Sequence, residues 1–345
     1  MLYVQAEQLR EITQAIFKAV GSMDDVATYM AGSLVENNLM GHDSHGVIRV
    51  PAYVERIEAG QIRPAATPQV IKETRTTAVV KGNWAFGQVS AKYATQLVID
   101  KAAEMNIASA AVVECNHIGR LGEYAEMIAA NRMFGMVVSG GATAQFRGVA
   151  PYGGAKGALG TNPYAFAMPA GEQKPFIADF ATSVVAEGKL QVARAKGIPL
   201  PEGAILDKAG QPTTDANEYY NGGVLLPFGG HKGYSFSLLA DLLGALLAGS
   251  EVVGKPPYTA GTFLMALRID AFRPFAEFAE AVDKRFAEIK AVPPAPGFDE
   301  VLIPGEPEAR AKKKRLEEGI PVPEDTWGKI TAVARKLRVV VEPAH

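Results

Sequence analysis

Apolar residues recur at helical spacing at the start of the chain. A spacing of three or four residues places side chains on one face of a helix. Here the apolar positions at that spacing are Leu9, Ile12, Ile16 and Val20. Gly21 marks the end of this helix, and Ser22 with Asp25 is typical of the cap of a second helix, which we predict to run to about Met40.

From Thr77 the pattern changes to short β-branched runs that alternate with helical stretches. We predict strands over residues 78–81, 107–113 and 136–139, and helices over 90–105 and 121–132. Strands that alternate with helices in this way indicate an α/β domain.

The rest of the chain combines glycine-rich turns with further helices. The predicted elements are a glycine-rich segment at 148–160, strands at 161–169, 176–180 and 262–269, a turn-rich stretch at 203–221, and helices at 183–196, 229–247, 275–289, 306–318 and 326–337. Because both ends of the chain are helical, we expect them to pack together as one domain around an inserted α/β core.

Composition narrows the class of protein. A chain of 345 residues with 48% hydrophobic and 21% charged residues can bury a large core, in two or three domains or one elaborated domain. A net charge of -2 gives no sign of a nucleic-acid surface, so small molecules or copies of the chain are the expected partners. The single Cys115 excludes an internal disulfide, and no leader or apolar membrane span is visible, so we expect a soluble cytoplasmic protein.

Candidate chemistry is concentrated in Gly41-His42-Asp43-Ser44-His45-Gly46 and the residues that follow it. If a helix begins near Ser44, then His45, Arg49 and Tyr53 share one face, provided that Pro51 bends the helix little or the helix starts later. An imidazole can transfer a proton near neutral pH, and a guanidinium can bind a carboxylate through two parallel hydrogen bonds. The pair suits a small 2-oxo or 2-hydroxy acid.

Other interpretations of this cluster remain open. Each residue alone could be a helix cap, a solvated loop residue or part of a polar helix face. His42 and His45, with His117 or Asp43, could also bind a metal in a lyase or hydrolase, although no thiolate or His-Glu-x-x-His pattern supports it. Covalent catalysis by Ser44 is disfavoured, because adjacent residues on a helix do not face each other.

Two further segments have functional potential. His117, in Asn116-His117-Ile118-Gly119, follows a predicted strand at the end where α/β folds collect ligands. Gly229-Gly230-His231-Lys232-Gly233 precedes a helix, so its backbone N–H groups and Lys232 could hold a phosphate. The usual dinucleotide fingerprint is absent, since the glycines of residues 154–160 have the wrong spacing.

These segments lie among motifs that cover nearly the whole chain in order. The motifs are Gly41-His42-Asp43-Ser44-His45-Gly46, Asn116-His117-Ile118-Gly119, Gly160-Thr161-Asn162-Pro163, Asp179-Phe180-Ala181-Thr182-Ser183, Gly229-Gly230-His231-Lys232-Gly233 and Pro304-Gly305-Glu306. With them the chain closely resembles the type 2 malate/L-lactate dehydrogenase family, NAD(P)-dependent oxidoreductases that lack a Rossmann fold. Tyr53 and Phe86-Gly87-Gln88 also resemble the branch of broad hydroxycarboxylate dehydrogenases.

The resemblance implies a homodimer whose active site lies between domains and is completed by the other subunit. It implies that His45 donates the proton to the carbonyl with Ser44 beside it, that Arg49 anchors the substrate carboxylate, and that His117 lies near nicotinamide and substrate. The residues that the resemblance assigns to cofactor contact are Thr161, Asn162, Asp179, Phe180, Ala181, Thr182, Lys232, Pro304, Gly305 and Glu306.

The expected fold is therefore α/β, with a non-Rossmann NAD(P)-binding core that contains a mixed sheet, plus a mainly helical domain built from both chain ends. Residues 1–70 and 275–345 are expected to form the helical domain, and 71–274 the NAD(P)-binding domain. The expected activity is hydride transfer between NAD or NADP and a small 2-hydroxy or 2-oxo acid, without a metal. Reduction of a cyclic C=N bond beside a carboxylate is the nearest alternative, and a metal-dependent lyase a remote one.

Overall fold

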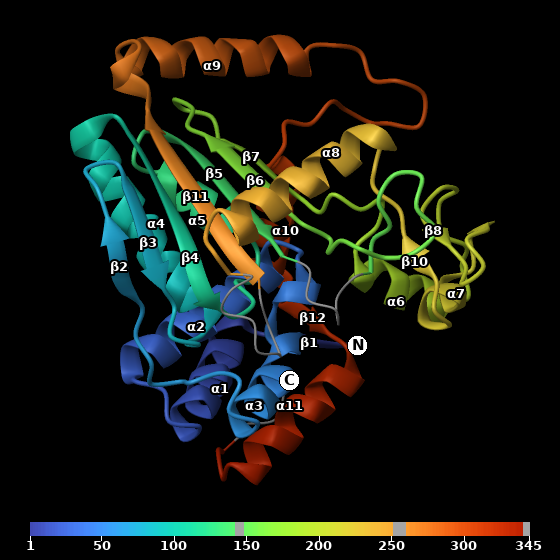
Figure 1. Ribbon diagram of the computed structural model, residues 1–345. Helices are drawn as coiled ribbons and strands as arrows, with labels where there is room; N and C mark the ends of the chain where they lie inside the picture. The colour runs from blue at the N-terminus through green and yellow to red at the C-terminus, as the bar shows by residue number, and fades with distance from the viewer. Residues whose placement is uncertain (142–147, 251–259, 341–345) are drawn as a thin grey trace.

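A seven-stranded sheet forms the centre of the molecule (Figure 1). The computed structural model describes residues 1–141, 148–250 and 260–340. In spatial order the strands are β2 (Gln69–Glu73), β3 (Thr77–Lys81), β4 (Ile107–Cys115), β11 (Ala260–Arg268), β5 (Met133–Gly140), β6 (Tyr164–Met168) and β7 (Phe176–Phe180). Only β3 and β4 pair in parallel, and the other neighbours are antiparallel. The mixed α/β fold is confirmed, and its sheet is unlike the parallel sheet of a Rossmann domain.

Helices cover both faces of this sheet. Val137 and Leu264 point into a core beneath α4 (Gly87–Met105) and α5 (Gly122–Ala129). Their neighbours Val138 and Phe263 belong to a second cluster with Ala240 of α8 (His231–Ala240), since successive strand residues face opposite sides. We predicted one helix to about Leu247. In the structure α8 ends at Ala240, and the π-helical segment η3 (Asp241–Leu246) follows it directly.

Glycines allow this second layer to lie directly on the sheet. A β carbon at Gly140 would be 2.1 Å from the carbonyl oxygen of Ala240, and one at Gly261 would be 1.7 Å from that of Gly244. Contacts this short are impossible, so the helix could not approach if either residue had a side chain.

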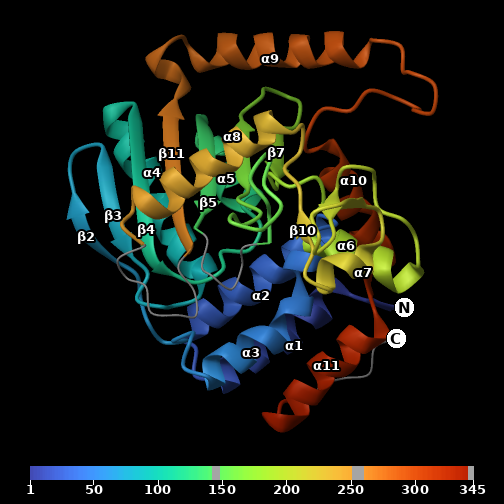
Figure 2. The same cartoon turned by 45° about the vertical axis from the view of Figure 1, so that its right-hand side comes forward.

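The two ends of the chain pack together, as expected. The strand β1 (Leu2–Val4) pairs with β12 (Ile320–Val322), and one apolar cluster joins α1 (Ala6–Ala19), α2 (Asp24–Leu39), α3 (Val50–Glu58) and α11 (Glu324–Lys336). The other two C-terminal helices are α10 (Glu306–Glu318) and α9 (Phe275–Lys290), and α9 lies at the opposite end of the molecule (Figures 1 and 2). The division at residues 70/71 and 274/275 stays a prediction.

Several element boundaries differ from the predictions. Ser22 does not cap α2, which begins at Asp24 after Met23 without a side-chain cap. The helix predicted from Ser183 begins only at Glu187, as α6 (Glu187–Lys196). The Ser183 hydroxyl donates a hydrogen bond to the carbonyl oxygen of Val185, which keeps residues 183–185 in a turn before the helix. The turn-rich stretch and the residues after it hold short elements: β8 (Ile205–Leu206), β9 (Pro212–Thr213), α7 (Ala216–Tyr220) and β10 (Val224–Leu225). No helix in the described part of the chain is long and apolar enough to cross a membrane.

Candidate active site

The cluster that begins at Gly41 forms two short 3-10 turns. These are η1 (Asp43–His45) and η2 (Val47–Arg49), and the α-helix α3 starts only afterwards. Pro51 lies in the first turn of α3, where no helical hydrogen bond is lost. The prediction that His45, Arg49 and Tyr53 share one helical face is therefore wrong, because the helix begins beyond two of them.

Three rings from different elements nevertheless come together. The imidazoles of His45 and His117 stack with their centroids 5.4 Å apart and their planes 21° from parallel. The Tyr53 hydroxyl lies 2.8 Å from Nδ1 of His117. His117 stands in the loop after β4, and the Asn116 amide fixes that loop by donating to the carbonyl oxygens of Trp84 and Ala85.

The guanidinium of Arg49 is bonded to the described residues through its Nε atom. Its Nε donates to the carbonyl oxygen of Ser44 at 2.6 Å. The two terminal nitrogens have no hydrogen-bond partner among residues 1–141, 148–250 and 260–340. The pair of N–H groups that could bind a carboxylate side by side is thus available.

Ser44 faces His45, contrary to the helical argument. Its Oγ lies 3.0 Å from Nδ1 of His45, because the two residues belong to a 3-10 turn rather than an α-helix. The geometric reason given against a Ser44–His45 interaction is therefore wrong. Since Ser44 occupies Nδ1, the Nε2 atom is the ring nitrogen that remains for a substrate.

Both histidines are neutral in the free protein at neutral pH. Burial, followed by the charge of Arg49, lowers the pKa of His45 to about 3. Burial also lowers the pKa of His117 well below its usual value, and His45 and Arg49 add to the effect. A negatively charged group bound to Arg49 would offset the charge of Arg49, and would therefore favour protonation of His45.

Two buried asparagines of α2 hold the turn that contains His45. The Asn38 amide accepts the backbone N–H of Val47 at 2.8 Å and donates to Asp43 at 2.7 Å. Asn37 donates to the carbonyl oxygen of His45 at 3.1 Å. Arg315, at the end of α10, forms two hydrogen bonds with the Asp43 carboxylate, at 2.6 and 3.0 Å.

Three of these positioning residues, Asn37, Asn38 and Arg315, were not found in the sequence. The spacing of residues in a sequence predicts which side chains are neighbours on the same helix or strand. It could not predict the contact between Arg315 and Asp43, because these residues are far apart in the sequence. The only available signal was two adjacent amides, Asn37 and Asn38, at the apolar end of a predicted helix.

A cavity of about 200 Å³ lies beside this site, between α5, β7 and α10. It brings together two segments expected to contact a cofactor, since Asp179 and Gly305 both line it with Arg120, Lys174 and Glu308. One oxygen of Asp179 accepts the backbone N–H of Gly122 at 2.6 Å, and burial raises the pKa of this carboxyl.

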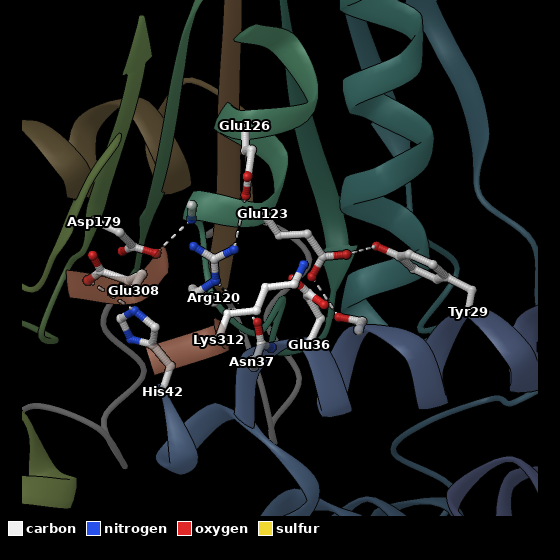
Figure 3. A network of polar contacts seen from close by, with 12 residues as sticks. Tyr29, Glu36, Asn37, His42, Arg120, Glu123, Glu126, Asp179, Glu308 and Lys312 are labelled. Carbon is white, nitrogen blue, oxygen red and sulfur yellow. Dashed lines mark hydrogen bonds and ion pairs between the residues drawn. The ribbon is translucent and has the colours of Figure 1, made fainter. Parts of the chain in front are cut away.

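A polar network surrounds the cavity, and Figure 3 shows its side chains pointing toward one another from α2, α5, β7 and α10. Arg120 donates to Asn37 at 3.2 Å and lies 3.4 Å from Glu126. Glu123 accepts from Tyr29 at 2.8 Å and from Ser33 at 2.6 Å, which fastens α5 to α2.

Other residues expected to contact a cofactor are engaged within the protein. The Asn162 amide donates to Asp241 at 2.7 Å, and the Thr182 hydroxyl donates to the carbonyl oxygen of Thr161 at 2.9 Å. Both residues are buried, so only their backbone could meet a ligand without rearrangement.

The remaining predicted positions lie at element ends. Glu306 begins α10, where its carboxylate accepts the N–H of Ile303 and pairs with Lys290. The carbonyl of Pro304 accepts from Ile177 of β7. Lys232 is exposed in the first turn of α8, and Phe180 packs on Phe228 at the end of β7, just before Ala181.

His42 does not join the other histidines. Its Nε2 lies 3.5 Å from Glu308 of α10, whereas His45 stacks on His117. Among the described residues, no group of three His, Cys, Asp or Glu side chains is arranged to hold a metal ion.

Beside a mixed sheet without the Rossmann pattern, the paired imidazoles can transfer a proton and the guanidinium can bind a carboxylate, which suits chemistry on a small organic acid. The chain belongs to the malate/L-lactate dehydrogenase family, whose sequence profile matches residues 4–331. It is accordingly an oxidoreductase of this type.

Relatives and solved structures agree along the whole chain. It is 36% identical over 346 residues to the malate/(S)-sulfolactate dehydrogenase of Methanothermus fervidus, which covers 98% of this chain and 99% of the relative. The sulfolactate dehydrogenase structure from Methanocaldococcus jannaschii has a TM-score of 0.91 at 33% identity, covering 99% and 98% of the two chains. The malate dehydrogenase structure from Entamoeba histolytica has a TM-score of 0.92 at 27% identity, covering 99% of each.

Proposed function

We propose that the protein reversibly reduces a small 2-oxo acid of the malate or lactate type with NADH or NADPH. The observation that carries this proposal is the Arg49 guanidinium, whose terminal nitrogens are available close to the stacked rings of His45 and His117. Arg49 holds the carboxylate through paired hydrogen bonds, which leaves the neighbouring carbonyl oxygen beside the imidazoles.

His45 supplies the proton for the carbonyl oxygen. Its Nδ1 faces Ser44, so Nε2 is the atom that meets the substrate. Binding of a carboxylate on Arg49 offsets the charge that helps to lower the pKa of His45, and so favours the protonated ring. In the oxidative direction the same nitrogen accepts the proton of the hydroxyl group. A positioned acid of this kind accelerates a reaction by roughly a hundred- to ten-thousandfold.

The cavity at Asp179 suits one end of a nicotinamide dinucleotide. Only one of the Asp179 carboxylate oxygens is bound by Gly122, so the other can accept a sugar hydroxyl. The same cavity is lined by three basic and three acidic side chains, so it offers a ligand both donors and acceptors: Arg120, Lys174, Lys312, Glu126, Asp179 and Glu308. When bound, the nicotinamide supplies or accepts the hydride.

The loop between β4 and α5 connects the cavity with the chemistry. His117 stands near its start and Arg120 near its end, so a ligand that extends along this loop would reach from the cavity to the imidazoles. The segments at Thr161–Asn162, Asp179–Thr182, Lys232 and Pro304–Glu306 are the proposed cofactor contacts.

The proposed assembly is a homodimer in which the second subunit completes the active site. An exposed apolar face on α8 and η3 supports it, because large patches of this kind on a protein surface are typical of interfaces. The exposed residues of this face are Phe236, Leu238, Leu239, Leu242 and Leu246.

Oxidation of NADH and NADPH by the purified protein tests the proposal, with oxaloacetate, pyruvate and piperideine-2-carboxylate as substrates. We expect turnover with at least one 2-oxo acid and no effect of a chelator. Turnover with piperideine-2-carboxylate alone would favour C=N reduction, and complete inactivity with every compound would refute the proposal.

Variants separate the two roles. We expect His45→Ala to lower kcat by about two to four orders of magnitude with little change in KM for the cofactor. Arg49→Lys should mainly raise KM for the acid, because an ammonium group cannot form the paired hydrogen bonds. Arg285→Lys, on the exposed face of α9, is the matched control and should behave like the wild type.

A further inference from the structure

Two carboxylates face the interior of the cavity between α5, β7 and α10. Asp179 belongs to β7 and Glu308 to α10, and both line the cavity. Figure 3 shows the two groups near each other, with the His42 ring beside Glu308. Burial raises the pKa of Asp179, and the negative charge of Glu308 adds to this rise. Asp179 and Glu308 therefore act on a ligand together, as a carboxylate pair.

One oxygen of Asp179 is fixed and the other is open. The backbone N–H of Gly122 donates to Oδ2 at 2.6 Å, whereas Oδ1 has no hydrogen-bond partner in the described part of the chain. A carboxylate accepts hydrogen bonds, so the group of a ligand that meets Oδ1 must be a donor such as a hydroxyl.

The start of α10 offers no site for a phosphate. Phosphates commonly bind where the first N–H groups of a helix are free. Here Glu306 accepts the N–H of Ile303 at 2.8 Å, and Pro307 has no N–H. The pKa of Glu308 is lowered by its interaction with His42 and, to a smaller extent, by one with its own backbone N–H. Carboxylates of the protein itself thus satisfy N–H groups at this helix start.

The cations of the cavity leave its negative charge largely uncompensated. Among the described residues three cations line the cavity, and two of them are paired with acids. Arg120 lies 3.4 Å from Glu126, and Lys312 lies 2.5 Å from Glu36. The third, Lys174, is exposed, and salt screens the charge of an exposed group. The charge that remains inside the cavity is that of the carboxylate pair.

The carboxylate pair lies at the adenosine end of the proposed dinucleotide. The nicotinamide must meet the substrate at His45 and His117, and the loop between β4 and α5 leads from there to the cavity. The adenosine ribose of NADH has two adjacent hydroxyl groups, both of which can donate to a carboxylate. In NADPH a phosphate replaces the 2′ hydrogen-bond donor and adds a charge of about -1.5 to -2.

We propose that Asp179 and Glu308 select NADH over NADPH, because they bind the hydroxyl groups of the adenosine ribose and repel a 2′-phosphate. This inference rests on the proposed function, which leaves the choice between the two dinucleotides open. Glu308 lies outside the segments expected to contact the cofactor, so its role is new. Since like charges repel strongly at a partly buried site, the preference in affinity should be about tenfold or more.

Fluorescence titration of the wild type with NADH and with NADPH measures this preference without any substrate. We expect Kd for NADPH to exceed Kd for NADH by about tenfold or more. Competition with two fragments locates the preference at the ribose. AMP should displace NADH more effectively than adenosine 2′,5′-bisphosphate, which differs from AMP by the 2′-phosphate.

Glu308→Gln removes one negative charge and keeps the size of the side chain. We expect it to lower the ratio of the two Kd values at least about threefold, mainly through tighter binding of NADPH, with kcat for NADH oxidation changed less than about twofold. Glu317→Gln is the matched control, since Glu317 is an exposed acid further along α10, and it should keep the wild-type ratio. If Glu308→Gln does not fold, Asp179→Asn should lower the same ratio while it weakens the binding of NADH.

Equal affinity for the two dinucleotides in the wild type would overturn the inference, as would tighter binding of NADPH or an unchanged ratio in both variants. These results leave the proposed function intact, because the protein would still bind a dinucleotide and reduce a 2-oxo acid. Failure of the proposed function looks different, because the protein would then oxidise neither dinucleotide with any 2-oxo acid, while the titrations would still report the preference. A protein that binds neither dinucleotide would refute both.

Discussion

Gly46→Ala should damage both stability and activity, because Gly46 lies against the side chain that holds the active-site turn. A β carbon at this position would be 2.1 Å from Oδ1 of Asn38 and 2.4 Å from its Cγ. The φ of Gly46 is -90°, which any residue can adopt, so the damage would come from the contact rather than from the backbone. Asn38 is 3% exposed and its amide is bonded to Val47 and Asp43, so its side chain could turn away only by breaking these bonds.

The magnitude follows from the hydrogen bonds that Asn38 would lose. Its bonds with Val47 and Asp43 each contribute about 1 kcal/mol, and the N–H of buried Val47 would be left without an acceptor at a further cost of about 1–3 kcal/mol. We expect the free energy of unfolding to fall by about 3–5 kcal/mol in total. Displacement of η2 should also lower kcat/KM by more than about tenfold, since Arg49 moves with it.

Urea unfolding and initial rates measure these effects, with Gly32→Ala as the matched control. A β carbon at Gly32, in the interior of α2, meets nothing within 4 Å, so alanine there should stabilise the protein by about 0.5–1 kcal/mol. In an Asn38→Ala background, Gly46→Ala should cost much less than alone. Wild-type stability and kcat/KM in Gly46→Ala would refute the reasoning.

Three further predictions concern the same region. Between about pH 7 and about pH 5, His45 should contribute about 2 kcal/mol to a fall in the free energy of unfolding, because unfolded His45 takes up a proton and folded His45, with its lowered pKa, does not. His117 adds to this fall, and His45→Gln should remove only the part that belongs to His45, as measured by urea unfolding. Arg315→Met should lower kcat/KM about tenfold in rate assays by loosening Asp43, whereas Arg310→Met, which breaks an exposed pair with Glu300, should not. Asp179→Asn should raise KM for the dinucleotide about tenfold or more with KM for the acid unchanged, and equal changes in both would contradict the assignment of the cavity.

Helices and strands that face a buried core were predictable from the chain alone. The helix α4 has its buried residues at helical spacing, and β4 is a mostly buried strand in which residues 110–113 are buried in succession. The strand β2 was missed because almost all of its residues are exposed and no apolar alternation marks it. The strands β1 and β12 were missed because each has three residues, too few for a period to appear.

Which residues come together in the candidate site was more predictable than how they are arranged. His45, Arg49 and His117 were recognised by residue type and by the glycines around them. The expected helix was wrong because Asn38 accepts the N–H of Val47, which gives that segment a partner outside any helix. Spacing along a sequence carries no information on such contacts, which depend on how distant elements pack.

The buried asparagine Asn37 connects the cavity with the turn that carries His45. Its oxygen accepts from Arg120, which lines the cavity, and its nitrogen donates to the carbonyl of His45. A side chain that is 0% exposed cannot exchange either partner for water, so a movement of Arg120 must be followed by the turn that carries His45 or cost a buried hydrogen bond. The position of His45 thus depends on the same contacts that shape the proposed dinucleotide site.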